Sequence, residues 1–200
     1  MKKINTFSFI AAVLICSMPS AFGGLQIGAG IPNPDAKMKD ISGKEISFSD
    51  ARKENGLLVM FTCNTCPVVM KNQDRAKEIC RQAKEKGIGV ILLNSNEASR
   101  QDGDSWEDMK AYASRQGFDW AYVVDKNSVM ADAFGAQRTP ENFLFDKQLK
   151  LVYHGAIDDN PGNPSAVSRK HLEEAILEML AGKEVSVKTT RSVGCGIKRL

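Results

Sequence analysis

The chain has 200 residues, of which 42% are hydrophobic and 26% are charged. This length suits a single compact domain, and the composition excludes long disorder and fibrous structure. Basic residues number 27 and acidic residues 24; residues 1–23 contain two lysines and no acid, so the remaining chain carries 25 minus 24, or +1. A nearly neutral chain gives no electrostatic argument for nucleic-acid binding.

Residues 1–23 have the pattern of a secretory signal peptide. Two lysines precede an apolar run that ends at Cys16, and small residues follow at Ala21 and Gly23. An uncleaved membrane anchor is disfavoured because this apolar run is well short of the about 20 residues that a spanning helix needs. Lipidation at Cys16 is also disfavoured, because the bulky Ile15 stands where a lipoprotein normally has a small residue. We predict cleavage near Gly23, export to the periplasm or the exterior, and no membrane span after removal of the signal.

Beyond this segment, short apolar runs alternate with amphipathic patterns. Strands are predicted over residues 57–61, 88–93, 121–124, 142–145 and 151–154, and helices over 69–87, 105–116, 128–134 and 172–182. This order predicts an α/β fold with a central mixed β-sheet flanked by helices on both faces. The sheet is parallel in its first half and closes with an antiparallel hairpin. Residues 24–187 form the predicted domain, and 188–200 a polar, flexible tail.

Removal of the signal leaves Cys63, Cys66, Cys80 and Cys195. Four cysteines are too few for a disulfide scaffold, so they indicate chemistry rather than architecture. Cys80 lies on the apolar face of its helix, where a free cysteine behaves as a small hydrophobe. Cys195 lies between two glycines, and the chain after Gly182 can extend about 40 Å. It either pairs with Cys63, as an additional redox thiol, or remains an unpaired or intermolecular thiol.

The segment FTCNTCP, residues 61–67, lies between a buried strand and an amphipathic helix. A zinc site would need four ligands, but no second CxxC or HxxxH accompanies the pair, and His154 and His171 are isolated. We therefore expect no metal and no cofactor. The unpaired N–H groups at a helix N-terminus stabilise a thiolate. We expect Cys63, at the exposed first turn, to attack a disulfide, and Cys66, three residues on, to resolve the mixed disulfide.

Together with Thr139-Pro140 ahead of a later strand, this CxxC junction resembles the thioredoxin superfamily. Other stretches are similar to its redoxin branch, related to AhpC/TSA and to peroxiredoxins: ILLNSN (91–96), AFGAQRTPENFLFD (133–146), LVYHGAIDDN (151–160) and GCGIK (194–198). The resemblance implies a thioredoxin-like fold and a cis peptide at Thr139-Pro140. It also implies that this loop faces the cysteine pair and presents its backbone to a substrate strand.

The chain departs from both groups in specific positions. Thioredoxins commonly have Trp before the first cysteine and Gly-Pro between the pair, whereas this chain has Thr62 and Asn64-Thr65. In the peroxiredoxin PxxxTxxC pattern, counted back from Cys66, Cys63 occupies the threonine position and Val59 the proline position. Because of these departures, the redox potential of thioredoxins does not transfer to this chain. The sequence alone therefore does not fix the direction of electron transfer.

Three functions stay open on the sequence. The leading one is an exported thiol-disulfide oxidoreductase with protein disulfide or dithiol substrates and a redox partner protein. A peroxiredoxin-like thiol peroxidase would use Cys63 as well. A non-catalytic binding module would hold Cys63 and Cys66 in a permanent structural disulfide.

Overall fold

The computed structural model describes residues 24–200. The predicted signal peptide, with its cleavage near Gly23, lies outside the described residues. Within residues 24–200, no helix is both long enough and apolar enough to cross a membrane.

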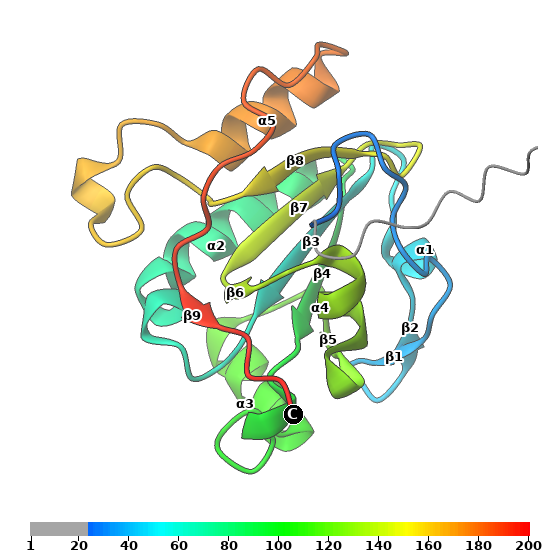
Figure 1. Ribbon diagram of the computed structural model, residues 1–200, viewed down its shortest axis with the longest axis vertical. Coiled ribbons are helices and arrows are strands. Elements are labelled where there is room, and N and C mark those ends of the chain that lie inside the picture. The colour runs from blue at the N-terminus through cyan, green and yellow to red at the C-terminus, as the bar shows by residue number, and fades with distance from the viewer. Residues whose placement is uncertain (1–23) are drawn as a thin grey trace, which may run out of the picture.

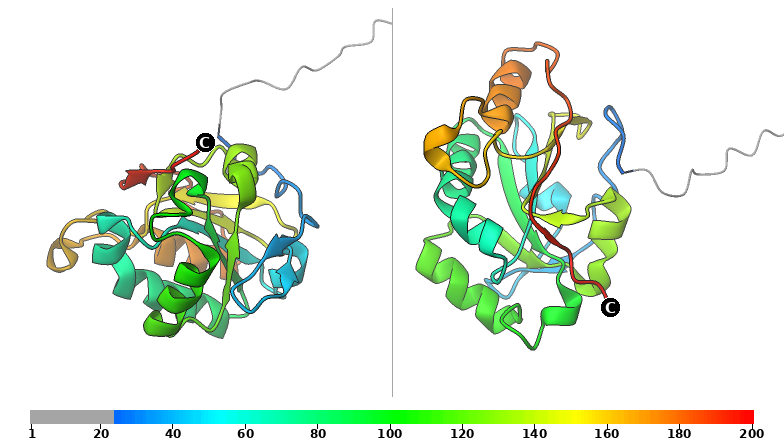
Figure 2. Two further views of the ribbon diagram at one scale, coloured as in Figure 1. Left: turned by 90° about the horizontal axis from the view of Figure 1, so that it is seen from below. Right: turned by 60° about the vertical axis from the view of Figure 1, so that its left-hand side comes forward.

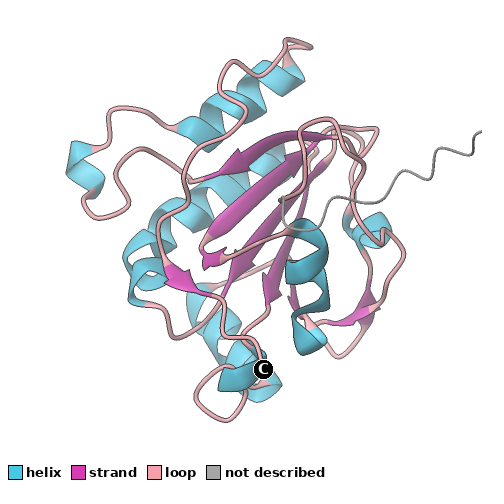
Figure 3. Ribbon diagram, in the orientation of Figure 1, coloured by secondary structure: helices cyan, strands magenta, loops and turns pink. Residues whose placement is uncertain are grey.

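The centre of the molecule is a five-stranded mixed sheet (Figure 3). Its strands are β3 (Leu57–Thr62), β4 (Gly89–Asn94), β5 (Ala121–Val124), β7 (Glu141–Phe145) and β8 (Leu151–Gly155), in the spatial order β5-β4-β3-β7-β8. The first three run parallel, and β7 and β8 are antiparallel to their neighbours. The predicted mixed sheet, including its closing hairpin, is confirmed.

Strand β3 is buried along its whole length, because helices cover both faces of the sheet. Its side chains alternate between two cores, as a strand requires: Leu58 and Met60 pack on one side, Leu57 and Val59 on the other. Figures 1 and 2 show the layers. Helices α2 (Pro67–Glu85), α3 (Trp106–Gln116) and α5 (His171–Leu180) pack on one face, and α1 (Phe48–Ala51) and α4 (Val129–Phe134) on the other. The prediction of helices on both faces is confirmed.

Several short elements were not predicted. They are the helix α1, the strands β1 (Met38–Lys39), β2 (Glu45–Ile46), β6 (Arg138–Thr139) and β9 (Cys195–Gly196), and the 3-10 turns η1 (Glu97–Ser99), η2 (Lys126–Ser128) and η3 (Pro164–Ala166). Two-residue strands leave too short a pattern to recognise in a sequence. Strands β6 and β9 matter most, because they pair with each other beside the cysteines.

The segment after α5 returns across the domain instead of extending as a free tail (Figure 1, red). The N–H of Thr190 donates to the carbonyl of His154 at 3.0 Å, and further along, the N–H of Ile197 donates to the carbonyl of Gln137 at 3.0 Å. The side chain of Ile197 is buried in the core on the α4 side of the sheet. The expectation of flexibility is corrected on this point, because backbone pairing and one apolar anchor hold a segment that is polar overall.

Candidate functional site

The two cysteines of the CxxC segment lie in the loop that joins β3 to α2. Helix α2 begins at Pro67, which has no N–H to leave unpaired, and Cys66 is the residue that caps it. Cys63 therefore precedes the helix and does not lie in its first turn. Its exposed fraction is only 1%, and that of Cys66 is 3%. The expectation of an exposed Cys63 is wrong, because Cys195 of the C-terminal segment packs over the two cysteines.

A disulfide joins Cys66 to Cys195, across 129 residues of sequence and a Cα–Cα distance of 6.0 Å. Cys63 has no disulfide partner among residues 24–200. Cys195 therefore pairs with Cys66, which neither alternative for Cys195, a bond to Cys63 or an unpaired or intermolecular thiol, anticipated. The Cys63–Cys66 bridge of the alternative binding module is not the one formed. Cys80 is buried in the core on the α2 side, where burial raises the pKa of its thiol far above the usual range, as expected for a packing residue.

The loop before β7 approaches both cysteines. The Thr139-Pro140 peptide is cis, which confirms the prediction. The hydroxyl of Thr139 lies 3.4 Å from Cys63 Sγ, and its carbonyl oxygen lies 3.4 Å from Cys66 Sγ. The structure therefore brings Cys63, Cys66 and Thr139 together, as the resemblance to the thioredoxin superfamily implied.

The backbone of this loop is already paired with the protein's own C-terminal strand. Strands β6 and β9 are antiparallel, with Thr139 opposite Cys195 and Arg138 opposite Gly196. A Cβ at Gly194 would lie 2.0 Å from the carbonyl oxygen of Thr139, so only glycine permits this close approach. The C-terminal strand thus occupies the edge at which a substrate strand is expected.

A buried carboxylate, Asp104, holds the cysteine loop from the opposite side. It is fully buried, and its oxygens accept hydrogen bonds from the N–H of Asn64 at 2.8 Å and from the hydroxyl of Thr65 at 3.1 Å. The side-chain amides of Asn94 and Asn96 donate to it at 2.7 and 3.0 Å. Sequence reasoning missed Asp104, because nothing in its surrounding loop distinguishes it from the neighbouring acids.

Tyr122 of β5 extends this network. Its hydroxyl donates to the side-chain carbonyl of Asn64 at 2.9 Å and accepts from Asn94 at 3.2 Å. Burial raises the pKa of Tyr122 well above its ordinary value, so the phenol keeps its proton and its role as donor. Both residues between the cysteines are therefore fixed by side chains from the core.

A buried carboxylate, Glu141, stabilises the turn that carries the Thr139-Pro140 peptide. The carboxylate of Glu141 accepts from the N–H groups of Gln137 and Arg138 at 2.8 and 2.9 Å, and from Nε2 of His154 at 2.6 Å. Burial raises the pKa of Glu141, but these hydrogen bonds outweigh burial and the net pKa is lowered. His154 is thus a structural partner of the loop.

The described residues hold no group of three or more His, Cys, Asp or Glu side chains arranged to bind a metal ion.

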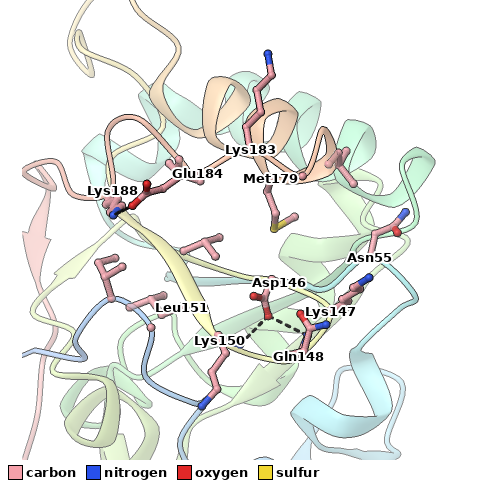
Figure 4. A pocket seen from close by; sticks show the side chains of 16 residues that line it. Asn55, Asp146, Lys147, Gln148, Lys150, Leu151, Met179, Lys183, Glu184 and Lys188 are labelled. Atoms are coloured by element: carbon pink, nitrogen blue, oxygen red, sulfur yellow. Dashed lines mark hydrogen bonds and ion pairs between the residues drawn. The ribbon is translucent and has the colours of Figure 1, made fainter.

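A separate cavity of about 520 Å³ lies between the β7–β8 turn and the end of α5 (Figure 4). Its charged lining includes Lys147, Lys150 and Lys188, and no cysteine lines it. Lys183 points away from the cavity. Because no cysteine lines this cavity, the cavity forms no part of the cysteine site.

The chain is similar in sequence to a thiol-disulfide oxidoreductase and in fold to two solved structures. The chain is 27% identical over 128 residues to the thiol-disulfide oxidoreductase ResA of Bacillus thuringiensis (strain Al Hakam), covering 64% of this chain and 68% of ResA. An uncharacterized conserved protein from Geobacillus kaustophilus superposes with a TM-score of 0.81 at 30% identity, covering 88% of this chain and 93% of the other. A thioredoxin-like protein in its oxidised form superposes with a TM-score of 0.61 at 20% identity, covering 80% and 100%.

The sheet, the cis-proline loop and the CxxC segment define a protein of the thioredoxin-like fold. Residues 29–154 match the AhpC/TSA family, and the chain belongs to that family. Its similarity to ResA places thiol-disulfide oxidoreductases among its relatives.

Proposed function

We propose that the protein is an exported thiol-disulfide oxidoreductase in which Cys63 is the attacking nucleophile and Cys66 the resolving thiol. One observation carries the proposal: an unbridged thiol, Cys63, lies beside the Thr139-Pro140 loop, and a cysteine that forms a disulfide follows it three residues later. A purely structural bridge needs no such neighbouring thiol. Similarity to ResA supports the same reaction class.

The reaction proceeds in two exchanges. The Cys63 thiolate attacks one sulfur of a substrate disulfide, forming a mixed disulfide and releasing the other substrate sulfur as a thiol. Cys66 then attacks Cys63 Sγ, which forms the Cys63–Cys66 bridge and releases the second substrate thiol. Run backward, the same steps oxidise a dithiol. The backbone of Thr139 supplies the edge against which a substrate strand pairs once β9 has separated from β6.

The role of each cysteine is tested with the mature protein in its reduced form and a peptide that contains one disulfide. Cys63→Ser should abolish reduction of the peptide, whereas Cys66→Ser should accumulate a mixed disulfide at Cys63, detected by mass spectrometry. Cys80→Ser is the matched control and should react like the wild type. Unchanged activity in Cys63→Ser would refute the assignment.

Three further measurements address the rest of the proposal. Hydroperoxide consumption at a rate comparable with disulfide exchange would instead favour a peroxidase using Cys63. Intact-mass analysis of exported protein should show a chain that begins near Gly24; retention of residues 1–23 in that material would contradict the proposed export. The reduction potential of the Cys63/Cys66 pair would then assign the protein as a reductant or an oxidant.

A further inference from the structure

The C-terminal segment is anchored on both sides of Cys195. Before it, the N–H of Thr190 donates to the carbonyl of His154 at 3.0 Å. After it, the N–H of Lys198 donates to the side-chain carbonyl of Asn96 at 3.0 Å, and the carbonyl of Lys198 accepts from the N–H of Ala98 at 3.0 Å. These anchors lie outside β9 and do not involve the sulfur of Cys195, so they keep that cysteine near Cys63 and Cys66 when β9 separates from β6. The right-hand view of Figure 2 shows the red segment crossing the domain.

Cys66 therefore has two neighbouring cysteines available to it. Cys195 is bonded to it through the β6–β9 pair. Cys63 packs in the same small cluster, with Val69 of α2. Thiol-disulfide exchange needs a thiol close to a disulfide, and this cluster contains both.

We propose that Cys195 is a third redox cysteine, and that Cys66 exchanges its bond between Cys63 and Cys195. This inference rests on the proposed function of Cys63 and Cys66. After substrate reduction has formed the Cys63–Cys66 bridge, the Cys195 thiolate attacks Cys66 Sγ. The Cys66–Cys195 bond forms, the Cys63–Cys66 bond breaks, and Cys63 leaves as a thiolate that takes up a proton. The step conserves electrons and needs no further oxidant.

The structure corresponds to the product of this step: the disulfide lies at Cys66–Cys195 and Cys63 is again a thiol. Cys195 is partly exposed, whereas Cys63 and Cys66 are buried. An external dithiol therefore reaches the bridge at Cys195. Its attack releases the Cys66 thiol and forms a mixed disulfide on Cys195, and its second thiol then frees Cys195 and leaves as a disulfide. Substrate and electron donor are thus served by different cysteines.

The experiment follows the bridges in time. The reduced mature protein receives one equivalent of a disulfide peptide, is quenched in acid, alkylated and mapped by mass spectrometry. In the wild type, the Cys63–Cys66 bridge should appear first and give way to Cys66–Cys195, while in Cys195→Ser it should accumulate. Accumulation of Cys63–Cys66 in the wild type with Cys195 alkylated would overturn the inference. The proposed function fails separately, if Cys63→Ser still reduces the peptide.

Two glycine variants test the covering role of β9 in the oxidised protein. Gly194→Ala places a Cβ 2.0 Å from the Thr139 carbonyl oxygen, so the strand must shift, whereas a Cβ at Gly196 meets no atom within 4 Å. Alkylation of native Cys63 should become about tenfold faster or more in Gly194→Ala and stay at the wild-type rate in Gly196→Ala. Equal rates in both variants would contradict the cover, and matching circular dichroism spectra confirm that each variant is folded.

Discussion

The loop that carries Cys63 and Cys66 is held from two sides by different kinds of interaction. On the core side, the buried carboxylate of Asp104 accepts four hydrogen bonds, two of them from residues between the cysteines. On the other side, the C-terminal segment contributes a two-residue strand pair and one disulfide. Fully satisfied buried networks rigidify a structure, whereas a disulfide opens by exchange with a thiol. One side therefore fixes the geometry of the cysteines, and the other can be released by their chemistry.

The largest effect should come from removing the bridge on the releasable side. It closes a loop of 129 residues, so Cys195→Ser should lower the free energy of unfolding by about 3–5 kcal/mol under oxidising conditions. Urea denaturation monitored by circular dichroism measures this. Dithiothreitol should lower the stability of the wild type by a similar amount and that of the variant by less, because only the short Cys63–Cys66 loop remains to be opened. If dithiothreitol destabilises both equally, the bridge is not the cause.

The next effect belongs to the core side. Asp104→Ala leaves the buried side-chain amides of Asn94 and Asn96 and the half-buried N–H of Asn64 without their acceptor, and each buried group costs about 1–3 kcal/mol. We expect a loss of about 3 kcal/mol in urea denaturation, with slower disulfide exchange because the cysteine loop is no longer held. Asp102→Ala, at an exposed site two residues earlier, is the control. We call the hold of Asp104 on the cysteine loop the core-side clamp. Equal stability of the two variants would contradict this clamp.

The turn that carries the Thr139-Pro140 peptide lies between the two sides, and its contribution to the free energy of unfolding should depend on pH. The folded-state pKa of Glu141 is lowered from its ordinary 4.5, so its contribution to stability is present above about pH 4.5 and is lost as the pH falls through the folded value. Glu141→Gln should therefore cost about 1–2 kcal/mol at neutral pH, and the difference from wild type should shrink below about pH 4. Urea midpoints across this pH range measure it. Glu45→Gln, at an exposed site, is the control variant. A difference for Glu141→Gln that stays constant with pH would contradict the predicted loss of stability at low pH.

The sequence was sufficient for those parts of the molecule that obey a local rule. Strand β3 is a continuous apolar run, the Cys63–Cys66 spacing is visible directly, and the helix predicted over residues 105–116 corresponds to α3. The cis peptide before Pro140 followed from a family resemblance. These features depend on neighbours in the chain, or on a motif that keeps its spacing.

What the sequence did not show depends on contacts between distant segments. Cys195 and Cys66 are 129 residues apart, and no periodicity in a polar segment indicates which cysteine it reaches. The burial of Cys63 follows from that same contact, so it was missed as well. Asp104 resembles any loop acid until the fold brings Asn64 and Asn94 to its oxygens. Pairing across such separations is a property of the topology and not of local pattern.

The smallest effect tests how far the core-side clamp depends on the start of α3, immediately after Asp104. The hydroxyl of Ser105 accepts from the N–H of Asp108 at 3.0 Å, and the carboxylate of Asp108 accepts from the N–H of Ser105 at 3.2 Å, which together form a capping box. Ser105→Ala removes one of these bonds and should cost about 1 kcal/mol. Ser114→Ala, at an exposed position inside the same helix, should be neutral or slightly stabilising.

Hydrogen exchange of individual amides shows which segments open in Ser105→Ala. The amides of the first turn of α3 should lose protection in Ser105→Ala, because the helix end opens more often once its cap is gone. The amide of Asn64, which donates to Asp104 at 2.8 Å, should lose protection with them if the cap and the clamp open together. Protection lost in α3 alone would show that Asp104 holds the cysteine loop independently of the helix that follows it. The core side would then consist of the carboxylate and its asparagine partners, and the cap would serve only the helix.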